Sequence, residues 1–600
     1  MKSNVQEILT QEVNDIYKEI VRSSIEDGNG IYWKTVPQEN EDELREDIYM
    51  GSSGIMVFLI EYYKFNQSKE VCAIIEKGAN WLLNHCMTTV NSNGSFYTGR
   101  TGTIYTLIQA SIVTENDELY SRILKLPIFN SKSKFDIQKS DLLNGISGTI
   151  IGLLLIYNET FNSFLKKLLV DLTRKLIKRI NVEKKGMSWK TNSHVSLCGV
   201  SHGNSGIALV FMELGVFFEN PLFLHIAEKA FKYENQFFDK HERNWPDFRN
   251  VSENKLIEND NFFKNPGRLK KLRYVSSWCH GAPGIGLTRI RAFQIFKKKE
   301  YYINLINSGK NIVKSRFIMP NIPPCLCHGH LGNYFFFLEM YKQTKNKEYL
   351  NIFIENCLIE VAKKVKKGFY LPGRPLKYNL DLSFFLGISG VGYSYIQSLN
   401  PSSDFNYLLP SINQKSFDRM NSFGFKYFFK QKFKASFPLT LNQIPNQVLN
   451  KYLIGMERKG RETDLKKIIQ EINDPYIKFL FKVEKRKNQL SDNLKNEKNQ
   501  LKKRKYSFIK PNKLNENELF QVKLKVCSDI YLYKLLSKEY CVNIVLYPSN
   551  SVYKIKLITK EIYQLLAQKK IATYQYYYNK LNGDNQKISE FIKLGLLNNV

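Results

Sequence analysis

Two cysteines and one histidine occupy matching places in two glycine-containing motifs. Cys279 stands two residues before Gly281, and Cys327 and His328 stand two residues and one residue before Gly329. Two thiolates and one imidazole are a common ligand set for zinc at sites that leave the fourth coordination position open. The spacing therefore predicts one Zn²⁺ ion bound by Cys279, Cys327 and His328, in an open site suited to catalysis.

The alternative is that these three residues have a structural role. Free cysteine is among the most buried residue types and packs as a small apolar side chain. Closed structural zinc sites, in contrast, usually have four protein ligands, often in Cys-x-x-Cys pairs. The sequence contains no such pair. Cys325 is a competing ligand because it lies two residues from Cys327, although it is out of register with the glycines.

Four further residues stand close to glycines of the same kind. His202 and His280 each directly precede such a glycine, Trp278 lies three residues before one, and Asp141 lies four residues before another. Equivalent positions of a repeat meet on one side of a repeat protein. We therefore expect His202, His280 and Asp141 to converge with the metal ligands, and His280 and Trp278 to support them.

The elements that must position these residues are predicted by a Gly-x-x-Gly pair that occurs seven times. The first glycines of the pairs are Gly51, Gly99, Gly145, Gly203, Gly281, Gly329 and Gly387. Each pair leads into an apolar, helix-like run, and most are separated by a stretch with apolar residues at helical spacing. Glycine allows a sharp turn and a close backbone approach where a helix begins. The pattern predicts a mainly α protein, an α/α toroid of seven inner and seven outer helices.

The motifs LLNGISG (142–148), SHGNSG (201–206), WCHGAPG (278–284), CHGHLG (327–332) and LGISG (386–390) resemble those of the lanthionine synthetase C-like family, the lantibiotic cyclases. The resemblance covers roughly residues 1–400. It implies an α/α toroid with one zinc, bound by the cysteine of WCHG and by the cysteine and histidine of CHG. Carried over to this sequence, these are Cys279, Cys327 and His328.

The family reaction implied by the resemblance adds a peptide cysteine thiol to dehydroalanine or dehydrobutyrine and forms a thioether ring. Zinc would hold the thiol as a thiolate, whose free pKa is near 8.5. His202 is predicted to deliver the proton to the α-carbon, and Asp141 to orient His202. One departure is Val275, because some bacterial cyclases have an arginine four residues before the WCHG cysteine. Arg273 is near that place but out of register.

The net charge of +32 is concentrated in the C-terminal third. Residues 401–600 hold 37 Lys and Arg against 17 Asp and Glu. Most of the positive charge is lysine, in a sequence rich in Asn, Ile and Tyr, so nucleic acid is not the expected partner. No run of 18 apolar residues and no apolar secretory start are present, which predicts a cytoplasmic protein, with a membrane-associated biosynthetic complex as an alternative.

The sequence predicts three parts: a toroid at 1–405, a basic helical linker region at 406–510 and a small α+β domain at 511–600. Within the last part, strands are expected at 520–529, 541–548 and 551–558, and helices at 559–568, 572–581 and 588–597. This order is similar to the PqqD-like winged fold, which implies recognition of a leader peptide. A docking domain for a dehydratase and a winged-helix nucleic-acid binder are the alternatives.

Three functions remain open from the sequence. The first is a peptide cyclase whose partners are a dehydrated precursor peptide with its leader, a separate dehydratase and a membrane transporter complex. The second is an enzyme that adds glutathione or another small thiol to dehydrated proteins. The third is a non-catalytic scaffold of a peptide-modification complex, against which the presence of both His202 and Asp141 argues.

Overall fold

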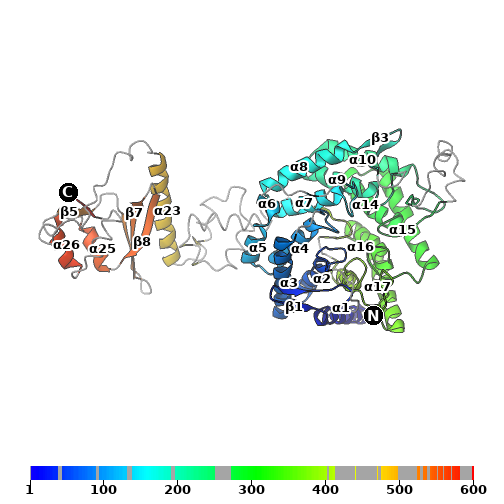
Figure 1. Cartoon of the computed structure of the whole chain (residues 1–600), viewed down its shortest axis with the longest axis horizontal. Helices are drawn as coiled ribbons and strands as arrows, with labels where there is room; N and C mark the ends of the chain where they lie inside the picture. Colours follow the sequence, from blue (N-terminus) through cyan, green and yellow to red (C-terminus); the bar gives the residue numbers. More distant parts are fainter. Residues whose placement is uncertain are drawn as a thin grey trace. The chain divides into compact units, whose positions relative to one another are not determined.

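The computed structural model divides the chain into two compact units, residues 1–423 and 424–600 (Figure 1). It describes residues 2–412 apart from 38–43, 90–92, 131–134, 136–137, 191–195, 250–271 and 402–404. In the second unit it describes residues 440, 443, 469–470, 475–496, 523–526, 531–536, 541–549, 552–558, 560–568, 571–581 and 597–599.

Seven buried helices form the inner ring of the first unit, and each begins directly after the first glycine of a Gly-x-x-Gly pair. They are α2 (Ser52–Phe65), α4 (Arg100–Val113), α7 (Ile146–Thr160), α9 (Asn204–Phe217), α14 (Ala282–Phe296), α16 (His330–Thr344) and α18 (Ile388–Leu399). Each contacts the next, and α18 contacts α2, so the ring closes. The predicted mainly α toroid is confirmed.

An outer layer covers the ring on its solvent side (Figure 1). It consists of α1 (Lys2–Arg22), α3 (Lys69–Thr88), the short pair α5 (Asp117–Ile123) and α6 (Pro127–Asn130), α8 (Ser163–Lys178), α10 (Pro221–Asn235), α15 (Lys299–Ile318) and α17 (Lys347–Lys367). These helices are amphipathic. In α8, for example, Leu165, Leu169, Leu172 and Leu176 are buried at helical spacing, whereas Lys166 and Lys175 are exposed.

The second glycine of each pair is required by a close backbone contact. A Cβ atom at any of these seven glycines would overlap the carbonyl oxygen of the residue six positions earlier, for example Gly54 with Ile48 and Gly284 with Trp278. No side chain can be accommodated there without displacing the loop that leads into the helix. The repeated glycine is thus explained by the path of the loop at the inner-helix N-terminus.

These loops are linked around the toroid by backbone hydrogen bonds at one repeat position, two residues before the first glycine. We call the residues at this position the mouth ring: Tyr49, Tyr97, Leu143, Ser201, Cys279, Cys327 and Phe385. Among these described residues, amide-to-carbonyl bonds of 2.9–3.2 Å make six of the seven links, including Cys279 N–H to Cys327 O. At the seventh, the Thr98 hydroxyl donates to the Leu143 carbonyl at 2.9 Å. The mouth ring brings residues separated by more than 300 positions side by side.

Residues 405–412, which follow the last inner helix, run back inside the ring. The hydroxyl of Tyr97 donates to the Tyr407 carbonyl at 3.0 Å, and the Trp278 indole donates to the Leu408 carbonyl at 2.9 Å. On the far side of the segment, the Ile412 amide donates to Glu213 of α9 at 2.8 Å. Tyr407 and Leu408 are buried. The segment therefore fills the interior of the toroid directly behind Trp278.

The described part of the second unit has α+β structure. Helix α23 (Pro475–Asn496) packs on an antiparallel sheet of β6 (Tyr531–Leu536), β7 (Cys541–Ser549) and β8 (Val552–Ile558). A second antiparallel sheet contains β10 (Leu597–Asn599), β5 (Lys523–Val526) and β9 (Ile571–Thr573). The remaining helices are α25 (Lys560–Ala567) and α26 (Tyr574–Lys580).

The described elements of the second unit agree with the sequence predictions in part. The strands expected at 541–548 and 551–558 are present as β7 and β8, which form a hairpin in register from Ser549 opposite Val552. Within the basic helical linker region expected at 406–510, α23 is helical, but its residues Leu480 and Val483 are buried. Most of the helix expected at 588–597 lies outside the described residues, and its last residue, Leu597, begins β10.

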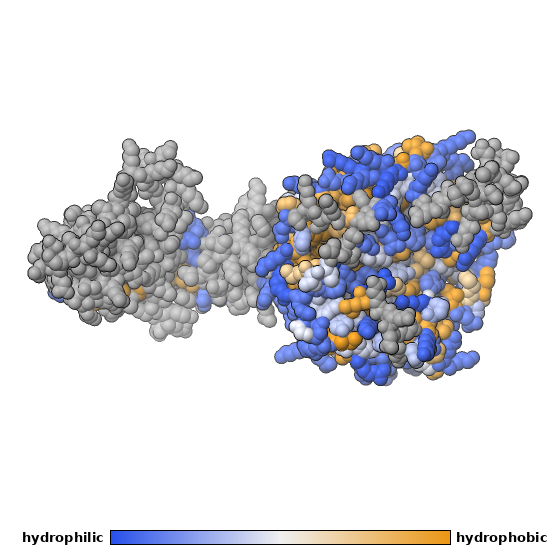
Figure 2. Space-filling model, in the orientation of Figure 1, coloured by the Kyte–Doolittle hydropathy of each residue, from blue (hydrophilic) through white to orange (hydrophobic). Residues whose placement is uncertain are grey.

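No helix in the described part of the chain is long and apolar enough to span a bilayer. Hydrophilic residues cover much of the face of the toroid seen in Figure 2, with apolar residues exposed between them.

Candidate metal and catalytic site

The thiols of Cys279 and Cys327 lie within hydrogen-bonding reach of each other in the mouth ring. Cys327 is 5% exposed, and Cys279 is more accessible. The hydrogen bond from the Cys327 thiol lowers the pKa of Cys279, and the positive charge of Arg249 adds to this shift. The same bond and burial raise the pKa of Cys327. Of the two sulfurs, Cys279 is therefore the one predisposed to lose its proton.

His328 is held by a backbone carbonyl. Its Nε2 lies 2.7 Å from the carbonyl oxygen of Gly373, and because a carbonyl only accepts, Nε2 carries the proton. Nδ1 is then left with a lone pair, which is the form that binds metals. Burial lowers the pKa of His328, which also favours the neutral imidazole.

Two further residues surround the sulfur atoms. The hydroxyl of Tyr49, the mouth-ring residue of the first repeat, donates to Cys327 Sγ at 2.8 Å. Cys325, the competing ligand considered above, is 1% exposed, and burial raises its pKa to about 12. Cys325 lies outside the repeat position that Cys279 and Cys327 share.

The donor set agrees with zinc in several respects. Two sulfurs lie close together, one of them with a lowered pKa, and a neighbouring imidazole has the tautomer that leaves Nδ1 free. As it stands, the described structure does not gather three His, Cys, Asp or Glu side chains into one group able to hold a metal ion. The residues therefore fit zinc in donor type, and in the proximity of the two sulfurs.

His202 and Asp141 form a hydrogen-bonded pair on the adjacent part of the mouth. Nδ1 of His202 lies 3.0 Å from Oδ2 of Asp141, whereas Oδ1 of Asp141 accepts from the Asn144 amide at 2.7 Å. Asp141 is 4% exposed. Since a carboxylate accepts, Nδ1 of His202 carries the proton and Nε2 is free to exchange one.

His280 lies beside this pair, with its ring centroid 5.8 Å from that of His202. Its side chain is 3% exposed, and Nε2 has no hydrogen-bond partner among the described residues. Burial, followed by the charge of Arg249, lowers the pKa of His280 to about 4. His280 is thus a neutral imidazole with an unused nitrogen at the mouth.

Arg249 supplies a positive charge that the sequence did not reveal. Asp247 holds its guanidinium with bonds of 2.7–3.1 Å, and the pair raises the pKa of Arg249. The guanidinium is near enough to the two sulfurs to influence their ionisation. Arg273, which lies near the position of the family arginine in the sequence, is exposed. Its backbone carbonyl accepts from the Asp247 amide at 2.9 Å.

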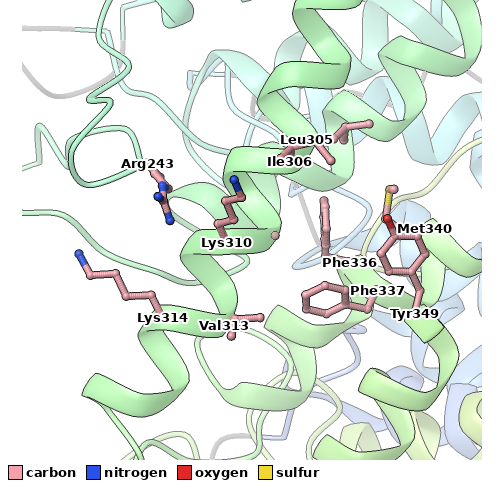
Figure 3. Close-up of a pocket in the computed structure, with 11 residues that line it drawn as sticks. Arg243, Leu305, Ile306, Lys310, Val313, Lys314, Phe336, Phe337, Met340 and Tyr349 are labelled. Carbon is pink, nitrogen blue, oxygen red and sulfur yellow. The ribbon is translucent and has the colours of Figure 1, made fainter.

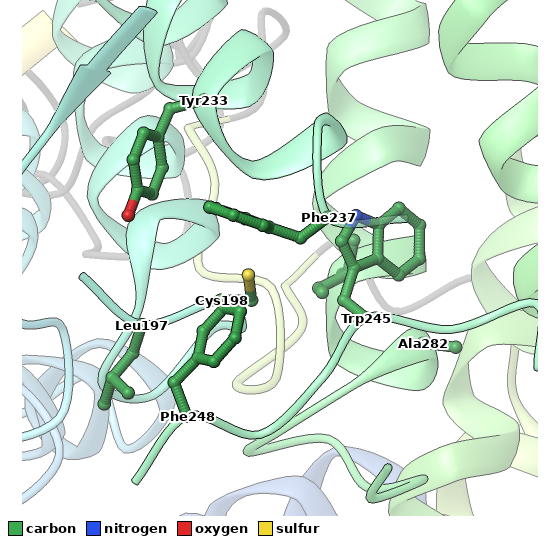
Figure 4. Close-up of a cluster of buried hydrophobic side chains, with 8 residues drawn as sticks. Leu197, Cys198, Tyr233, Phe237, Trp245, Phe248 and Ala282 are labelled. Carbon is green, nitrogen blue, oxygen red and sulfur yellow. The ribbon is translucent and has the colours of Figure 1, made fainter. Parts of the chain in front are cut away.

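A buried apolar cluster connects the loops that carry these residues. Figure 4 shows the rings of Phe237 and Phe248 close to Cys198, with Tyr233 and Trp245 on either side. Phe248 lies between Asp247 and Arg249 in the chain, Cys198 precedes the His202 loop, and Ala282 starts the helix after His280. Packing in this cluster therefore keeps three separate loops in a common arrangement.

A buried ion pair between α10 and α14 stabilises the loop that carries His202. Glu234 and Arg289, both fully buried, form a 2.7 Å contact. Glu234 also accepts from the Gly199 amide at 2.8 Å and from the Ser205 hydroxyl. Because unpaired charges are very costly in a core, these contacts strongly constrain the loop that presents His202.

The structure brings together most of the residues predicted from the sequence. Cys279 and Cys327 adjoin each other, His202 bonds Asp141, His280 lies beside His202, and Trp278 is buried with its indole bound to Leu408. Tyr49 and Arg249 were missed. Tyr49 could have been found, because it occupies the same repeat position as the two cysteines.

An α/α toroid with thiol and imidazole groups at one mouth is the framework predicted from the glycine and cysteine motifs. The sequence model of the lanthionine synthetase C-like protein family matches residues 42–410. The chain belongs to this family, which confirms the resemblance.

Two curated relatives and one solved structure illustrate the match. Lacticin 481/lactococcin biosynthesis protein LcnDR2 of Lactococcus lactis subsp. lactis is 27% identical over 392 residues, 62% of this chain and 38% of that protein. Glutathione S-transferase LANCL1 of Danio rerio is 23% identical over 305 residues, 48% of this chain and 66% of that protein. The chain thus spans less than two thirds of either relative. Nisin cyclase is 17% identical, with a TM-score of 0.46, covering 66% of this chain and 93% of that one.

Proposed function

We propose that this protein is a zinc-dependent cyclase that adds cysteine thiols of a ribosomally made peptide to dehydroalanine or dehydrobutyrine, forming lanthionine or methyllanthionine rings. The observation that carries the proposal is the meeting of the Cys279–Cys327 pair with the His202–Asp141 pair at one mouth of a lanthionine synthetase C-like toroid. Cys279, Cys327 and His328 would hold the ion, which when bound supplies the charge that keeps a substrate thiol deprotonated.

The protein's own residues would manage the proton. The Asp141 carboxylate accepts a hydrogen bond from Nδ1 of His202 and so presents Nε2 as the base. His202 takes the proton from the substrate thiol and returns it to the α-carbon after sulfur has attacked the β-carbon. A carbon–sulfur bond forms, the carbon–carbon double bond becomes single, and the mass of the peptide is unchanged.

Two neighbouring groups would assist this proton transfer. His280 is neutral and its ring already donates to the Cys198 backbone, so the unused Nε2 can accept a hydrogen bond from the substrate. Arg249 places a fixed positive charge near the two sulfurs, which favours the thiolate form. Both groups come from loops joined by the cluster in Figure 4.

A second candidate function is addition of a small thiol such as glutathione to a dehydrated residue. The name of the Danio rerio relative favours this alternative. The bond-forming step would be the same, but the thiol would come from a separate molecule. A dehydratase, a precursor leader and a transporter complex are further proposed partners only under the first function.

The deciding experiment incubates the full chain and Zn²⁺ with a synthetic peptide that contains one dehydroalanine and one cysteine, with and without glutathione. Thiol alkylation followed by mass spectrometry reads the products. A cyclase removes the alkylatable thiol without changing the mass. Addition of the mass of glutathione instead would support the second function, and a peptide that keeps both its mass and its free thiol with zinc and glutathione present would contradict both.

A further inference from the structure

A groove of about 540 Å³ lies on the outer side of the toroid between α15, α16 and α17. Its apolar part is lined by Val313, Phe336, Phe337, Met340 and Tyr349, and its other edge by Arg243, Lys310 and Lys314. Figure 3 shows the three cationic side chains together on one side and the aromatic and methionine side chains on the other. A volume of this size suits a bulky side chain and the backbone next to it.

Gly309 keeps the groove open. It lies in the interior of α15, where glycine costs roughly 1 kcal/mol of helix stability relative to alanine. A Cβ at this position would lie 3.3 Å from a ring carbon of Phe336, and larger side chains would extend into the groove. The glycine thus lies at the position where a side chain would close the space beside the aromatic residues.

Arg243 is held at the edge in an unfavourable backbone conformation. Its φ is +50°, a region that costs a non-glycine residue about 1–2 kcal/mol. Asp239 and Asn244 close the surrounding turn by two backbone hydrogen bonds of 2.9 and 3.3 Å. These two bonds fix the backbone of the turn that presents Arg243 to the groove.

The charges at this edge are only partly compensated. Lys314 lies 3.7 Å from Glu242, a weak ion pair with both side chains partly exposed. Within the described residues, no carboxylate lies within ion-pair distance of Arg243 or Lys310. Counting only the residues that the structure describes, the edge of the groove carries two cations without a carboxylate partner beside an apolar recess. This arrangement is complementary to an anionic ligand with an apolar side chain.

The groove is also connected to the catalytic mouth. Asn244, which follows Arg243, donates to the Val275 carbonyl at 3.1 Å and accepts from the Ala282 amide at 2.7 Å. These bonds tie the turn to both ends of the segment that contains Cys279. A ligand in the groove would therefore contact a turn that is hydrogen-bonded to the segment carrying Cys279.

We infer that this groove binds an acidic segment of the peptide substrate, with a large apolar side chain in the recess and carboxylates beside Arg243 and Lys310. The identity of the ligand as substrate rests on the proposed function, whereas the peptide chemistry follows from the groove. Binding there would hold the substrate while its cysteines are at the mouth.

The test uses the full chain and a fluorescein-labelled synthetic peptide, free of cysteine, serine and threonine, in which aspartates and glutamates flank one phenylalanine. Anisotropy should show binding that weakens with salt, since exposed charges are screened. Lys310→Glu combined with Arg243→Glu should weaken binding by about tenfold or more, because like charges replace attractive pairs. The matched control, Lys175→Glu on exposed α8, should change it less than about twofold.

Gly309→Leu should weaken binding by filling the recess, and a circular dichroism melting curve checks that this variant is folded. If Gly309→Leu does not fold, the charge variants still test the inference. Equal binding by the charge variants and wild type would overturn the inference. So would equal binding of a peptide with lysines in place of the acids, or tighter binding of a single-stranded DNA oligonucleotide.

A kinetic arm decides whether the occupant is the substrate. With a dehydrated, cysteine-containing peptide that carries the same acidic segment, Lys310→Glu should raise KM and leave kcat unchanged. An unchanged KM would overturn the assignment to substrate. Because the labelled probe lacks reacting groups, its binding is independent of cyclisation. Binding without any ring formation would contradict the proposed function alone, and ring formation without binding would contradict the groove alone.

Discussion

Two arcs of the mouth ring share one backbone arrangement and differ in their side chains. In one arc, Cys279 and Cys327 place sulfur at the mouth, and in the other, Phe385, Tyr49 and Tyr97 place aromatic rings there. Tyr49 stacks on Phe385 at 4.9 Å, and Tyr97 packs edge-on against it at 5.4 Å. The repeat therefore determines where a residue lies, and the residue type determines whether that place is reactive or structural.

The two cysteines of the sulfur arc should be required for zinc binding. Cys279→Ala or Cys327→Ala should remove the zinc and lower ring formation by about a thousandfold or more, since several kcal/mol of charge stabilisation is lost with the ion. Zinc content by mass spectrometry and turnover of the dehydrated peptide measure both effects.

The matched control for this arc is Cys325→Ala, which removes a buried thiol two residues from Cys327 but outside the mouth ring. It should retain the zinc. If Cys325→Ala lost the ion and Cys279→Ala kept it, the role of the repeat position would be refuted.

The His202–Asp141 pair lies next to the sulfur arc and should act after the metal is in place. His202→Asn should lower kcat by about a hundredfold or more, the usual contribution of a general acid or base, with zinc content unchanged. Asp141→Asn should have a smaller effect, because it alters the orientation of the imidazole and leaves the imidazole itself. A His202→Asn protein with wild-type kcat would exclude His202 from proton transfer.

Replacing the second glycine of a pair by alanine should lower the free energy of unfolding by a similar amount in both arcs. Gly54→Ala and Gly284→Ala each introduce a Cβ against a carbonyl oxygen, and overpacking of this kind costs about 2–3 kcal/mol. Urea unfolding followed by tryptophan fluorescence measures the loss, since all five tryptophans lie in the first unit.

Gly28→Ala is the control for these two variants, because no atom lies within 4 Å of the added Cβ. Its free energy of unfolding should stay close to that of the wild type. Marked destabilisation by only one of Gly54→Ala and Gly284→Ala would show that the arcs do not share one backbone design.

Tyr49 is where the aromatic arc meets the sulfur arc, and its removal should have the smallest effect. Tyr49→Phe deletes the hydroxyl that donates to Cys327 Sγ at 2.8 Å, and loss of such a supporting hydrogen bond lowers metal affinity by about tenfold. Competition with a chromophoric chelator measures the affinity.

Tyr97→Phe is the comparison within the same arc, since its hydroxyl bonds the Tyr407 carbonyl at 3.0 Å. It should cost about 1 kcal/mol of stability and leave zinc affinity unchanged. Equal zinc affinities for Tyr49→Phe and the wild type would show that the hydroxyl does not tune the sulfur.

The parts of the molecule that follow the repeat could be predicted from the sequence. The glycines mark the start of every inner helix, and the register of Cys279 and Cys327 predicts that they meet. Periodicity carries this information because one loop geometry recurs at each helix start. In the second unit, the hairpin of β7 and β8 was predictable from its strand residues and turn.

The parts that could not be predicted lie in irregular segments. Arg249 reaches the site from a loop with no repeat register, and residues 405–412 turn back into the toroid after the last glycine pair. The bond from His328 to Gly373 joins two such loops. Side chains placed by long-range packing of this kind leave no local signal, because neither spacing nor composition records which loops are neighbours.

The central claim is that two thiols and one imidazole of the mouth hold a zinc ion with one open position. Zinc K-edge X-ray absorption on the full chain tests it most directly. The claim predicts two sulfur ligands at about 2.3 Å and lighter ligands, including one imidazole, at about 2.0–2.1 Å. It further predicts one sulfur fewer in Cys279→Ala protein reconstituted with zinc. A coordination shell of four sulfurs, or a sulfur count unchanged in Cys279→Ala, would contradict it.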